Sequence, residues 1–415
     1  MGLPESPVHI GSSPMANDTM PPEIALTWQL GSNFGWGLYG IQIALQLTNS
    51  GRGRPILLSA IRPHKGDPIE REALHRIWLH QRKTIEGMQS RCVPDSRVDI
   101  RVPVLTALGN NCSRQFLWPS FDYNGTENHG LVFLENTLVT DDARDRFNNH
   151  DTVTAGSTWA RDLLRANGVY KTEACIQGVD PTFFCPGPKR AHLKDRFTIF
   201  AGGKIEYRKG QDIVLEVARR FREHHPELLL LCVWDNPWLN GDFFGLLDHS
   251  PYYPNMLDHV TDDGLHWERL LMDVGLPLNA VRIFGAIENH MLPLIMRDAD
   301  VALFPNRCEG GTNMMAMQTM ACGIPTILSA NTGHMDIIAD GGCLPLTRQS
   351  PVEIDRPKID AEGWGESDVE EILANLEFVY QDRKAARALG LVGAAFMGEF
   401  TWERQILKLA NLIGL

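Results

Sequence analysis

Two lysines stand five residues apart in a glycine-containing turn of the second half of the chain. The segment reads Gly202-Gly-Lys204-Ile-Glu-Tyr-Arg-Lys209-Gly210, follows an apolar run and precedes a helical pattern that begins at Gln211. A helix N-terminus presents N–H groups without intrahelical partners, and two ammonium groups beside it can flank one anion, for which a diphosphate is the obvious candidate. A solvated basic turn is the alternative interpretation of this segment.

A more specific pattern follows the apolar run that ends at Phe304. Residues 305–326 read PNRCEGGTNMMAMQTMACGIPT, with Glu309 in a glycine-containing loop and a helix predicted to begin near Thr312. Loop amides and a helix N-terminus at this place face a ligand at the carboxyl edge of a parallel sheet. Glu309 is the carboxylate expected beside that ligand.

A third glycine-containing turn lies near the N-terminus, where residues 31–40 read GSNFGWGLYG. It follows a predicted strand and opens a helix, so its backbone can approach a ligand closely. Its spacing differs from the G-x-G-x-x-G fingerprint of dinucleotide-binding proteins, which disfavours an NAD site. A tight strand-to-helix turn is the alternative.

These turns must be positioned by strands, and the chain alternates apolar runs with helical patterns in both halves. Buried strands are predicted at 24–28, 55–59, 98–105, 130–134, 153–157 and 174–176, then at 197–201, 228–234, 281–284, 300–304 and 325–329. Helical patterns separate them, for example at 40–47, 70–83 and 158–167. This alternation predicts an α/β protein with two Rossmann-like, doubly wound parallel sheets.

Length and charge agree with two domains. The chain has 415 residues and a net charge of −12; residues 1–190 hold 19 basic and 19 acidic residues, so the whole deficit lies after residue 190. The linker Gly178–Lys189, with three prolines and two glycines, separates the halves. We predict a flexible tail at 1–20, a first Rossmann-like domain at 21–190, a second at 191–385, and C-terminal helices at 386–415 that pack back towards the first domain.

Several function classes are disfavoured. A nucleic-acid groove needs a basic stripe, which the balance of charges does not provide. The chain contains no apolar run of about 20 residues, as a membrane-spanning helix needs, and no secretory signal pattern, so a cytoplasmic location is expected. The basic and apolar segment 71–83 could lie on a membrane, but a surface helix packed on the sheet is favoured.

No metal site is expected. The eight cysteines form no CxxC pair, and Asp141-Asp142 and Asp262-Asp263 lack partner ligands at a strand end. The cysteines are expected to be reduced thiols that lie mostly in the cores. The long, aromatic segment 235–263 could be a lid, an acceptor wall or a subunit contact, and the sequence leaves these alternatives open.

The motifs together resemble the retaining GT-B glycosyltransferases of family four, also called group 1. The linker GVDPTFFCP, the Gly-Lys…Lys-Gly turn, the Cys308–Pro325 block and the FTWE segment at 400–403 are similar to four family motifs in the same order. The resemblance implies the GT-B fold and transfer of a sugar from a nucleotide-diphosphate donor, UDP- or GDP-linked, to a hydroxyl of a carbohydrate or other acceptor. It also implies that the domain at 21–190 binds the acceptor and the domain at 191–385 binds the nucleotide sugar. It implies no cofactor and no metal, because cations of the chain neutralise the diphosphate.

The resemblance also implies site residues. Lys204 and Lys209 match the two cations on the donor diphosphate, and Glu309 matches the first of two motif glutamates, at the donor sugar. The remaining donor-binding residues implied by these loops are Gly203, Gly310, Gly311, Thr312 and Asn313, with Ile287 in the base-contacting region. Near the reacting carbon, Glu135 or Asn136 stands where the family often has a His-Asp pair, and Gly35 and Gly37 are placed at the acceptor side of the cleft.

One position departs from the family pattern. The second motif glutamate, which bonds the nucleotide ribose, normally stands eight residues after the first, and that place holds Met317. Alignment backwards from the Met-Ala-Cys-Gly end of the block puts Gln318 there instead, and we favour Gln318. A sugar-nucleotide epimerase of the same fold and a non-catalytic nucleotide-sugar-binding protein are the alternative functions.

Overall fold

The computed structural model describes residues 20–31, 34–59, 68–89, 97–113, 122–236, 246–261, 264–338, 341–355 and 359–415. The tail predicted at 1–20 lies outside these ranges except for its last residue. So do residues 237–245 and 262–263 of the long aromatic segment.

The first half builds a six-stranded sheet with the order β2-β1-β4-β6-β7-β8, in which all pairs are parallel. Its strands are β1 (Glu23–Leu26), β2 (Arg54–Leu57), β4 (Val104–Leu108), β6 (Asn128–Val132), β7 (Thr152–Ala155) and β8 (Thr172–Ala174). The helices are α1 (Gly35–Ser50), α2 (Pro68–Gln89), α3 (Asp141–Asn148) and α4 (Thr158–Ala166). The strands are almost wholly buried, as expected for a parallel sheet covered on both faces.

One strand prediction was wrong. The run 98–105 is not a single strand, because β3 (Arg97–Asp99) pairs with β5 (Asp122–Asn124) outside the main sheet and β4 begins at Val104. Pro103 stands between the two strands and has no N–H to donate to a ladder. The apolar pattern continues across this break, which is why the sequence did not reveal it.

The second half builds another six-stranded parallel sheet, with the order β13-β10-β9-β14-β15-β16. Its strands are β9 (Phe197–Lys204), β10 (Leu228–Asp235), β13 (Val281–Ile283), β14 (Val301–Phe304), β15 (Thr326–Ser329) and β16 (Leu344–Leu346). The helices are α5 (Gln211–Arg222), α7 (Trp267–Val274), α8 (Leu292–Met296), α9 (Met314–Ala321), α10 (Val369–Gln381), α11 (Arg383–Met397) and α12 (Trp402–Leu412). Two short hairpins accompany this half, β11 (Val260–Thr261) with β12 (Gly264–Leu265) and β17 (Gln349–Pro351) with β18 (Gly365–Ser367).

The predicted pair of doubly wound sheets is thus confirmed. In the second sheet the strand order reverses between β9 and β14, and in the first it reverses between β1 and β4. In open α/β sheets, ligands bind in the crevice outside the carboxyl ends of the strands at such a switch point. Lys204 is the last residue of β9, Lys209 follows that strand and Glu309 follows β14, so all three lie at the switch point of the second sheet.

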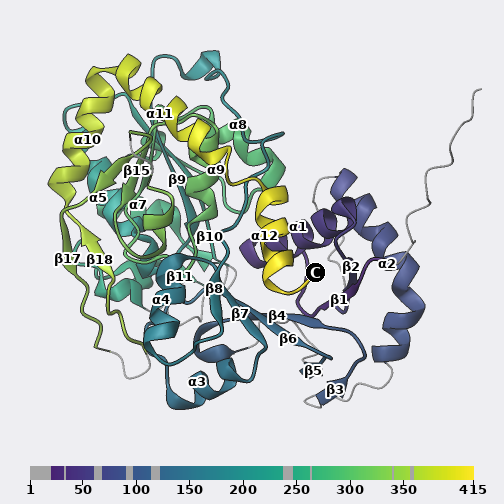
Figure 1. Ribbon diagram of the computed structural model, residues 1–415. Helices are drawn as coiled ribbons and strands as arrows, with labels where there is room; N and C mark the ends of the chain where they lie inside the picture. The colour runs from purple at the N-terminus through teal and green to yellow at the C-terminus, as the bar shows by residue number, and fades with distance from the viewer. Residues whose placement is uncertain are drawn as a thin grey trace, which may run out of the picture.

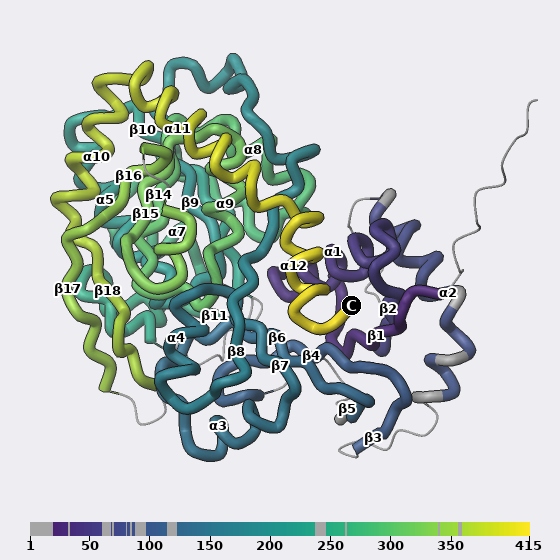
Figure 2. Tube along the Cα trace, in the orientation of Figure 1, coloured from purple at the N-terminus to yellow at the C-terminus, as the bar shows by residue number. Residues whose placement is uncertain are grey.

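The last helix crosses back to the first half. Thr401 caps α12 by accepting a hydrogen bond from the Arg404 N–H, and Trp402 and Ile406 are buried in one cluster with α1 side chains such as Leu38. Figures 1 and 2 show α12, in yellow, beside the purple α1, while α10 and α11 lie on the second half. The predicted domain limits themselves stay predictions.

The long aromatic segment is partly built into the second core. Leu246, Leu247 and Met256 are buried there, and Ser250 Oγ donates a hydrogen bond of 2.7 Å to Asp212 on α5. The described part of this segment is therefore anchored to the second half.

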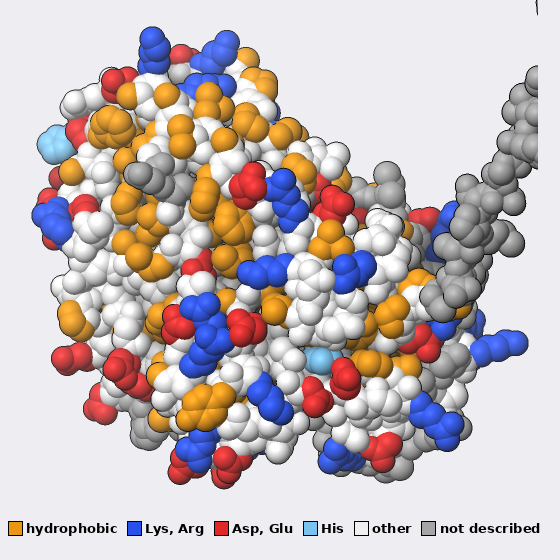
Figure 3. All heavy atoms as spheres, viewed as in Figure 1, with side chains coloured by type: hydrophobic (Ala, Val, Ile, Leu, Met, Phe, Trp, Pro, Cys, Tyr) orange, Lys and Arg blue, Asp and Glu red, His pale blue; other side chains and the backbone are white. Residues whose placement is uncertain are grey.

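The surface mixes both signs of charge. Figure 3 shows acidic and basic side chains interspersed over one face, with hydrophobic side chains gathered where Figure 1 places α11. No helix in the described ranges is both long enough and apolar enough to cross a bilayer.

Candidate functional site

The turn after β9 is pressed against the loop after β14. Lys204 ends β9, residues Tyr207–Lys209 form a short 3-10 turn, and Gly210 adopts a φ of +70° before α5 begins. A Cβ at Gly210 would lie 2.5 Å from the Pro305 carbonyl oxygen. Only glycine fits both the left-handed conformation and the close approach, so this residue brings the two predicted loops together.

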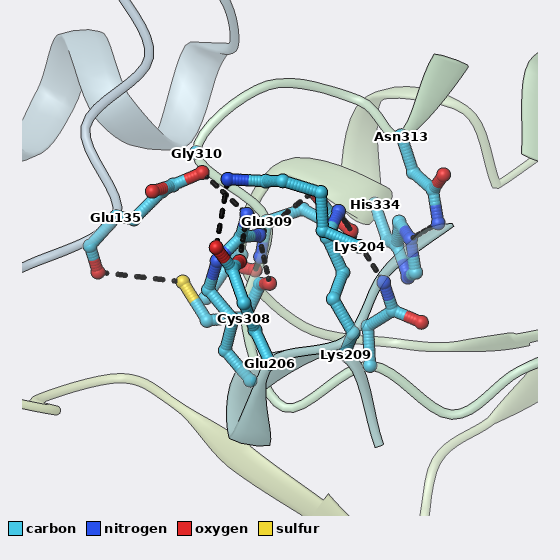
Figure 4. A network of polar contacts seen from close by, with 12 residues as sticks. Glu135, Lys204, Glu206, Lys209, Cys308, Glu309, Gly310, Asn313 and His334 are labelled. Carbon is cyan, nitrogen blue, oxygen red and sulfur yellow. Dashed lines mark hydrogen bonds and ion pairs between the residues drawn. The ribbon is translucent and has the colours of Figure 1, made fainter. Parts of the chain in front are cut away.

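The cations of this turn meet Glu309 from the other loop (Figure 4). Lys209 Nζ lies 2.5 Å from Glu309 Oε1, and Asn306 Nδ2 donates a hydrogen bond to the same oxygen. Burial alone would raise the pKa of Glu309, but Lys209 and Arg208 outweigh burial and lower it to about 2. Glu309 is therefore a buried carboxylate that stays ionised at neutral pH.

Arg208 lies at the centre of the cluster with its side chain 2% exposed. Its Nη2 is 2.6 Å from Glu135 Oε1 and 2.7 Å from Glu206 Oε2, and its Nη1 is 3.4 Å from Glu309 Oε2. Burial would lower the pKa of Arg208, but these three carboxylates raise it. Glu135 belongs to the first half, so the guanidinium joins the two halves of the chain.

Lys204 completes the set of charges. Its Nζ is 2.7 Å from Glu206 Oε1, and its side chain, 39% exposed, lies at the rim of the cluster. Burial would raise the pKa of Glu206, but Arg208 and Lys204 hold it below its usual value. Three cations and three carboxylates are thus interleaved, and the incoming charge of a ligand would have to compete with the existing pairs.

A buried histidine holds the start of α9. Asn313 has a φ of +60°, and its Oδ1 accepts a hydrogen bond from Ala316 N–H, so its Nδ2 is left to donate to His334 Nε2 at 3.1 Å. His334 Nδ1 lies 3.1 Å from the Ser329 carbonyl oxygen and 2.9 Å from Ser329 Oγ. This network requires a neutral imidazole, and burial lowers the pKa of His334 to about 4.

The helix itself separates the two alternatives for the ribose position. Met317 is buried in the apolar core with Ala316 and Met320. Gln318 is also buried, but its Nε2 donates a 2.7 Å hydrogen bond to Asn289 Oδ1, two residues beyond Ile287. Gln318 therefore faces the loop that the sequence assigned to the base, although its role in binding stays a prediction.

The glycine loop lies against the first half. A Cβ at Gly310 would come within 2.6 Å of the Leu134 carbonyl oxygen, and one at Gly311 within 2.8 Å of the Phe133 ring. Gly310 also accepts a 2.9 Å hydrogen bond from Ser157 Oγ. The two glycines allow the backbones of the halves to touch at the candidate site.

The residues predicted on the first half make different kinds of contact. Glu135 reaches the cluster through Arg208, whereas the Asn136 amide oxygen accepts hydrogen bonds from the Leu138 and Asp360 N–H groups. Asn136 thus holds the backbone at Leu138 and at Asp360 in place. Gly35, at the start of α1, lies next to Met314 at the start of α9, since a Cβ at Gly35 would lie 3.4 Å from Met314 Cε.

The other predicted residues lie on the same loops. Gly203 has a φ of +137° directly before Lys204, and Thr312 is fully buried with its hydroxyl 3.0 Å from Met317 Sδ. Gly37 closes the first turn, because a Cβ there would meet the Gly31 carbonyl oxygen at 2.2 Å. The structure thus brings the loops after β9 and β14, which carry most of the predicted second-half residues, into contact with each other.

Sequence reasoning missed the partners that neutralise and hold these groups. They are Arg208, Glu206, Asn306, His334 and the buried pair of Arg307 and Asp212. Arg307 is fully buried and donates two hydrogen bonds to the Asp212 carboxylate, at 2.9 and 2.7 Å. It also forms an ion pair with Glu366 at 2.7 Å, so it fixes the loop beside Glu309. The one visible signal was the alternating charge of Lys204, Glu206 and Arg208 at every second residue of the turn.

The described residues also include possible metal ligands and cysteines. Within the described ranges, no group of three or more His, Cys, Asp and Glu side chains could hold a metal ion. Asp141 pairs with Arg144 on α3, and the second aspartate pair, at 262–263, lies outside those ranges. The seven described cysteines are free thiols, and all but Cys185 are buried.

Comparison with known families adds a second line of information. The family model described as Glycosyl transferases group 1 matches residues 188–347. The model described as Family 4 Glycosyltransferase in conflict systems matches residues 286–409. Together they span the second half and every charged residue of the site except Glu135.

Two curated relatives match parts of the chain. The GDP-mannose-dependent alpha-(1-6)-phosphatidylinositol monomannoside mannosyltransferase of Mycolicibacterium smegmatis is 23% identical over 284 residues, which cover 64% of this chain and 63% of that protein. The D-inositol 3-phosphate glycosyltransferase of Stackebrandtia nassauensis is 28% identical over 189 residues, which cover 43% of this chain and 38% of that protein. The matches thus span less than two thirds of either relative.

Solved structures match over nearly the whole chain. Sucrose-phosphate synthase from Thermosynechococcus elongatus has a TM-score of 0.62 at 17% identity, with 95% of this chain and 98% of that chain covered. Anabaena HepE in complex with UDP-glucose also has a TM-score of 0.62, at 13% identity, with 94% and 99% covered. At these identities the likeness shows the fold.

Proposed function

We propose that this chain, which has the GT-B fold and belongs to the group 1 glycosyltransferases, transfers a sugar from a nucleotide-diphosphate donor to an acceptor hydroxyl with retention of the anomeric configuration. The observation that carries the proposal is the meeting of Lys209 and Glu309 at the switch point of the second sheet. The proposal places the diphosphate at the lysines and the donor sugar beside Glu309.

The chemistry follows from these positions. The bond between the anomeric carbon and the diphosphate breaks, and negative charge grows on the leaving diphosphate. Lys204, Lys209 and the N-terminal end of α9 would stabilise that charge, and preorganised electrostatic stabilisation of this kind usually makes the largest contribution to catalysis. The acceptor oxygen forms the new bond on the face from which the diphosphate leaves, and its proton passes to the departing phosphate oxygen.

The two halves take different parts of the reaction. The donor would lie on the second half, with Gln318 at the ribose and the loop at Ile287 near the base. The acceptor would lie on the first half, between the turn of Gly35 and Gly37 and the residue Glu135. The relatives named above include a GDP-mannose-dependent enzyme and a protein that binds UDP-glucose, which supports UDP- and GDP-sugars as the first donors to test.

A melting screen followed by a turnover assay tests the proposal. UDP-, GDP- and ADP-sugars are added to the protein, and the donor that raises the melting temperature most is then assayed for release of nucleoside diphosphate. Release with or without an acceptor supports a transferase. Stabilisation without release would favour the non-catalytic alternative, and a change of sugar configuration on the intact donor would identify an epimerase.

We further propose that the reaction needs no cofactor or metal, because cations of the chain stand where the diphosphate would bind. Activity should therefore survive an excess of EDTA. A loss that magnesium or manganese restores would contradict this, and it would direct attention back to the aspartate pairs.

A further inference from the structure

The position of Arg208 raises a question about charge during donor binding. Without a ligand, Lys209 forms an ion pair with Glu309. A bound diphosphate would draw the ammonium group towards itself and weaken that pair. Glu309, which is 4% exposed, would then be a buried carboxylate that has lost its nearest cation, a strongly unfavourable state unless another group compensates it.

Arg208 is placed to compensate. Its Nη1 faces Glu309 Oε2, the oxygen that Lys209 does not bond, at 3.4 Å. Its other contacts, to Glu135 and Glu206, hold the guanidinium from two further directions. Its backbone carbonyl also accepts hydrogen bonds from the Arg307 and Cys308 N–H groups, so the Arg208 backbone is tied to the loop that carries Glu309.

We propose that Arg208 is a positioning residue that keeps Glu309 ionised and in place once Lys209 has turned to the donor diphosphate. Through Glu135 the same guanidinium ties the first half to this state of the site. The inference rests on the proposed function, since it requires a diphosphate to compete for Lys209.

The other groups around Glu309 cannot replace Arg208. The titratable and charged groups that face Glu309 are Lys209 and Arg208 on the turn, His334 after β15, and the neighbouring thiol of Cys308, while Glu135 contacts Arg208. The His334 network requires a neutral ring, and Asn306 supplies a hydrogen bond without charge. Without Arg208, burial would raise the pKa of Glu309 and favour its protonated form.

Proton uptake on donor binding measures directly whether Glu309 stays ionised. Calorimetric titration of the best nucleotide sugar from the melting screen, at pH 6 in two buffers of different ionisation enthalpy, gives the number of protons taken up per site. The wild-type protein should take up almost none, because Arg208 keeps Glu309 ionised. Uptake of about one proton by the wild type would overturn the proposal, and this measurement needs no substitution.

A charge-balanced variant isolates the guanidinium. Arg208→Gln combined with Glu206→Gln removes one cation and one carboxylate, so the cluster stays neutral and folding is protected. This double variant should take up close to one proton on binding, and its kcat at pH 7 should fall about tenfold or more while the donor KM changes less than about threefold. Glu206→Gln alone is the matched control and should take up no proton.

The role of Arg208 and the proposed function are tested by different outcomes. Equal proton uptake by the wild type, the control and the double variant would overturn the role of Arg208 and leave the proposed function standing. A wild-type protein that binds none of the nucleotide sugars would overturn the proposed function and this inference with it. Melting curves of all three proteins confirm that the comparison is made between folded molecules.

Discussion

Both sheets have a switch point between two neighbouring strands, but the loops at the two switch points differ in charge. In the first half, residues 27–37 after β1 and 109–113 after β4 contain no charged side chain. Their contacts are neutral: Trp28 Nε1 donates a 2.9 Å hydrogen bond to the Trp36 carbonyl, and Asn110 Oδ1 accepts from the backbone of residues 135 and 136. In the second half, the corresponding loops after β9 and β14 carry all three cations and two of the three carboxylates described above, Glu206 and Glu309.

The difference shows what the fold contributes and what the residues contribute. Both crevices offer backbone N–H groups at a helix start, α1 in one and α9 in the other, and these starts approach each other at Gly35 and Met314. Only the second crevice holds cations that can neutralise a diphosphate. The first, lined by glycine, aromatic and amide groups, suits a neutral ligand rich in hydroxyls, which is the part of the acceptor in the proposed reaction.

The largest expected effect comes from removing a cation of the second crevice. Lys209→Ala should cost about 2 to 4 kcal/mol of transition-state stabilisation, or about 30- to 1000-fold in kcat/KM, because it deletes a charge-assisted contact to the leaving diphosphate. The measurement is nucleoside diphosphate release with the best donor. Lys384→Ala, on the exposed face of α11, is the control and should leave the rate unchanged. A folded Lys209→Ala protein with full turnover would show that the two crevices do not differ in function.

The second effect concerns stability in mild acid. His334 has a pKa of about 4 in the folded protein and about 6.5 when unfolded, so the unfolded chain binds the proton first as the pH falls. Stability from this group is complete above about pH 6.5 and is lost between 6.5 and 4, which amounts to about 2 kcal/mol between pH 7.5 and 5. Glu309, with a pKa of about 2, adds a loss only below about pH 4.5.

Urea unfolding at pH 7.5 and 5 measures this loss, and a substitution assigns it. His334→Gln should make the loss smaller by about the same 2 kcal/mol, because it removes the titrating ring. Some acid sensitivity should remain in the first half, where burial lowers the pKa of His129. His192→Gln, at an exposed position, is the matched control and should keep the full loss. An undiminished loss in His334→Gln would place the acid sensitivity elsewhere.

Much of the contrast between the two switch points could be predicted from the sequence. The two lysines, Glu309 and the glycines around them were located from residue type and spacing, since a strand, a short loop and a helix start follow one another along the chain. Most sheet strands were predicted within a few residues, because buried parallel strands form continuous apolar runs. The short strand β16, Leu344–Leu346, was missed because it offers too few residues for a pattern and contains Pro345.

The partners of the charges were not readable, for a physical reason. Arg208 meets Glu309 and Glu135 across about 100 and 70 positions of the chain, and His334 meets Asn313 across 21. Periodicity reports the burial of one element at a time and says nothing about which side chains face each other across two loops. For the same reason the sequence could not show which of Glu135 and Asn136 contacts Arg208.

A smaller effect tests the neutral crevice. Gly37→Ala should destabilise the protein by about 1 to 2 kcal/mol, because the added Cβ would overlap the Gly31 carbonyl oxygen. Gly87→Ala is the control, since a Cβ there meets nothing within 4 Å and alanine favours the helix. A kinetic measurement adds a second test, in which Gly37→Ala should raise the acceptor KM more than the donor KM. A larger rise in the donor KM would assign the first crevice to the donor.

The smallest expected effect lies at the ribose position and tests the alignment of the motif. Gln318→Glu should preserve donor binding or tighten it by up to about 1 kcal/mol, or about fivefold, because a carboxylate accepts hydroxyl hydrogen bonds more strongly than an amide does. Asn289, the present partner of Gln318, can rotate its amide and donate Nδ2 to the new carboxylate, so the substitution leaves no unpaired group.

Met317→Glu, one residue away, should have the opposite outcome. Met317 is fully buried in the apolar core, about 100° around α9 from Gln318, so an unpaired carboxylate there should lower the melting temperature without improving binding. Calorimetric titration of both variants with the best donor, together with their melting curves, decides between the positions. If Met317→Glu were well folded and bound the donor better while Gln318→Glu lost binding, the eight-residue interval would be the true spacing. The second crevice would then hold its nucleotide one residue earlier along α9 than the contact between Gln318 and Asn289 indicates.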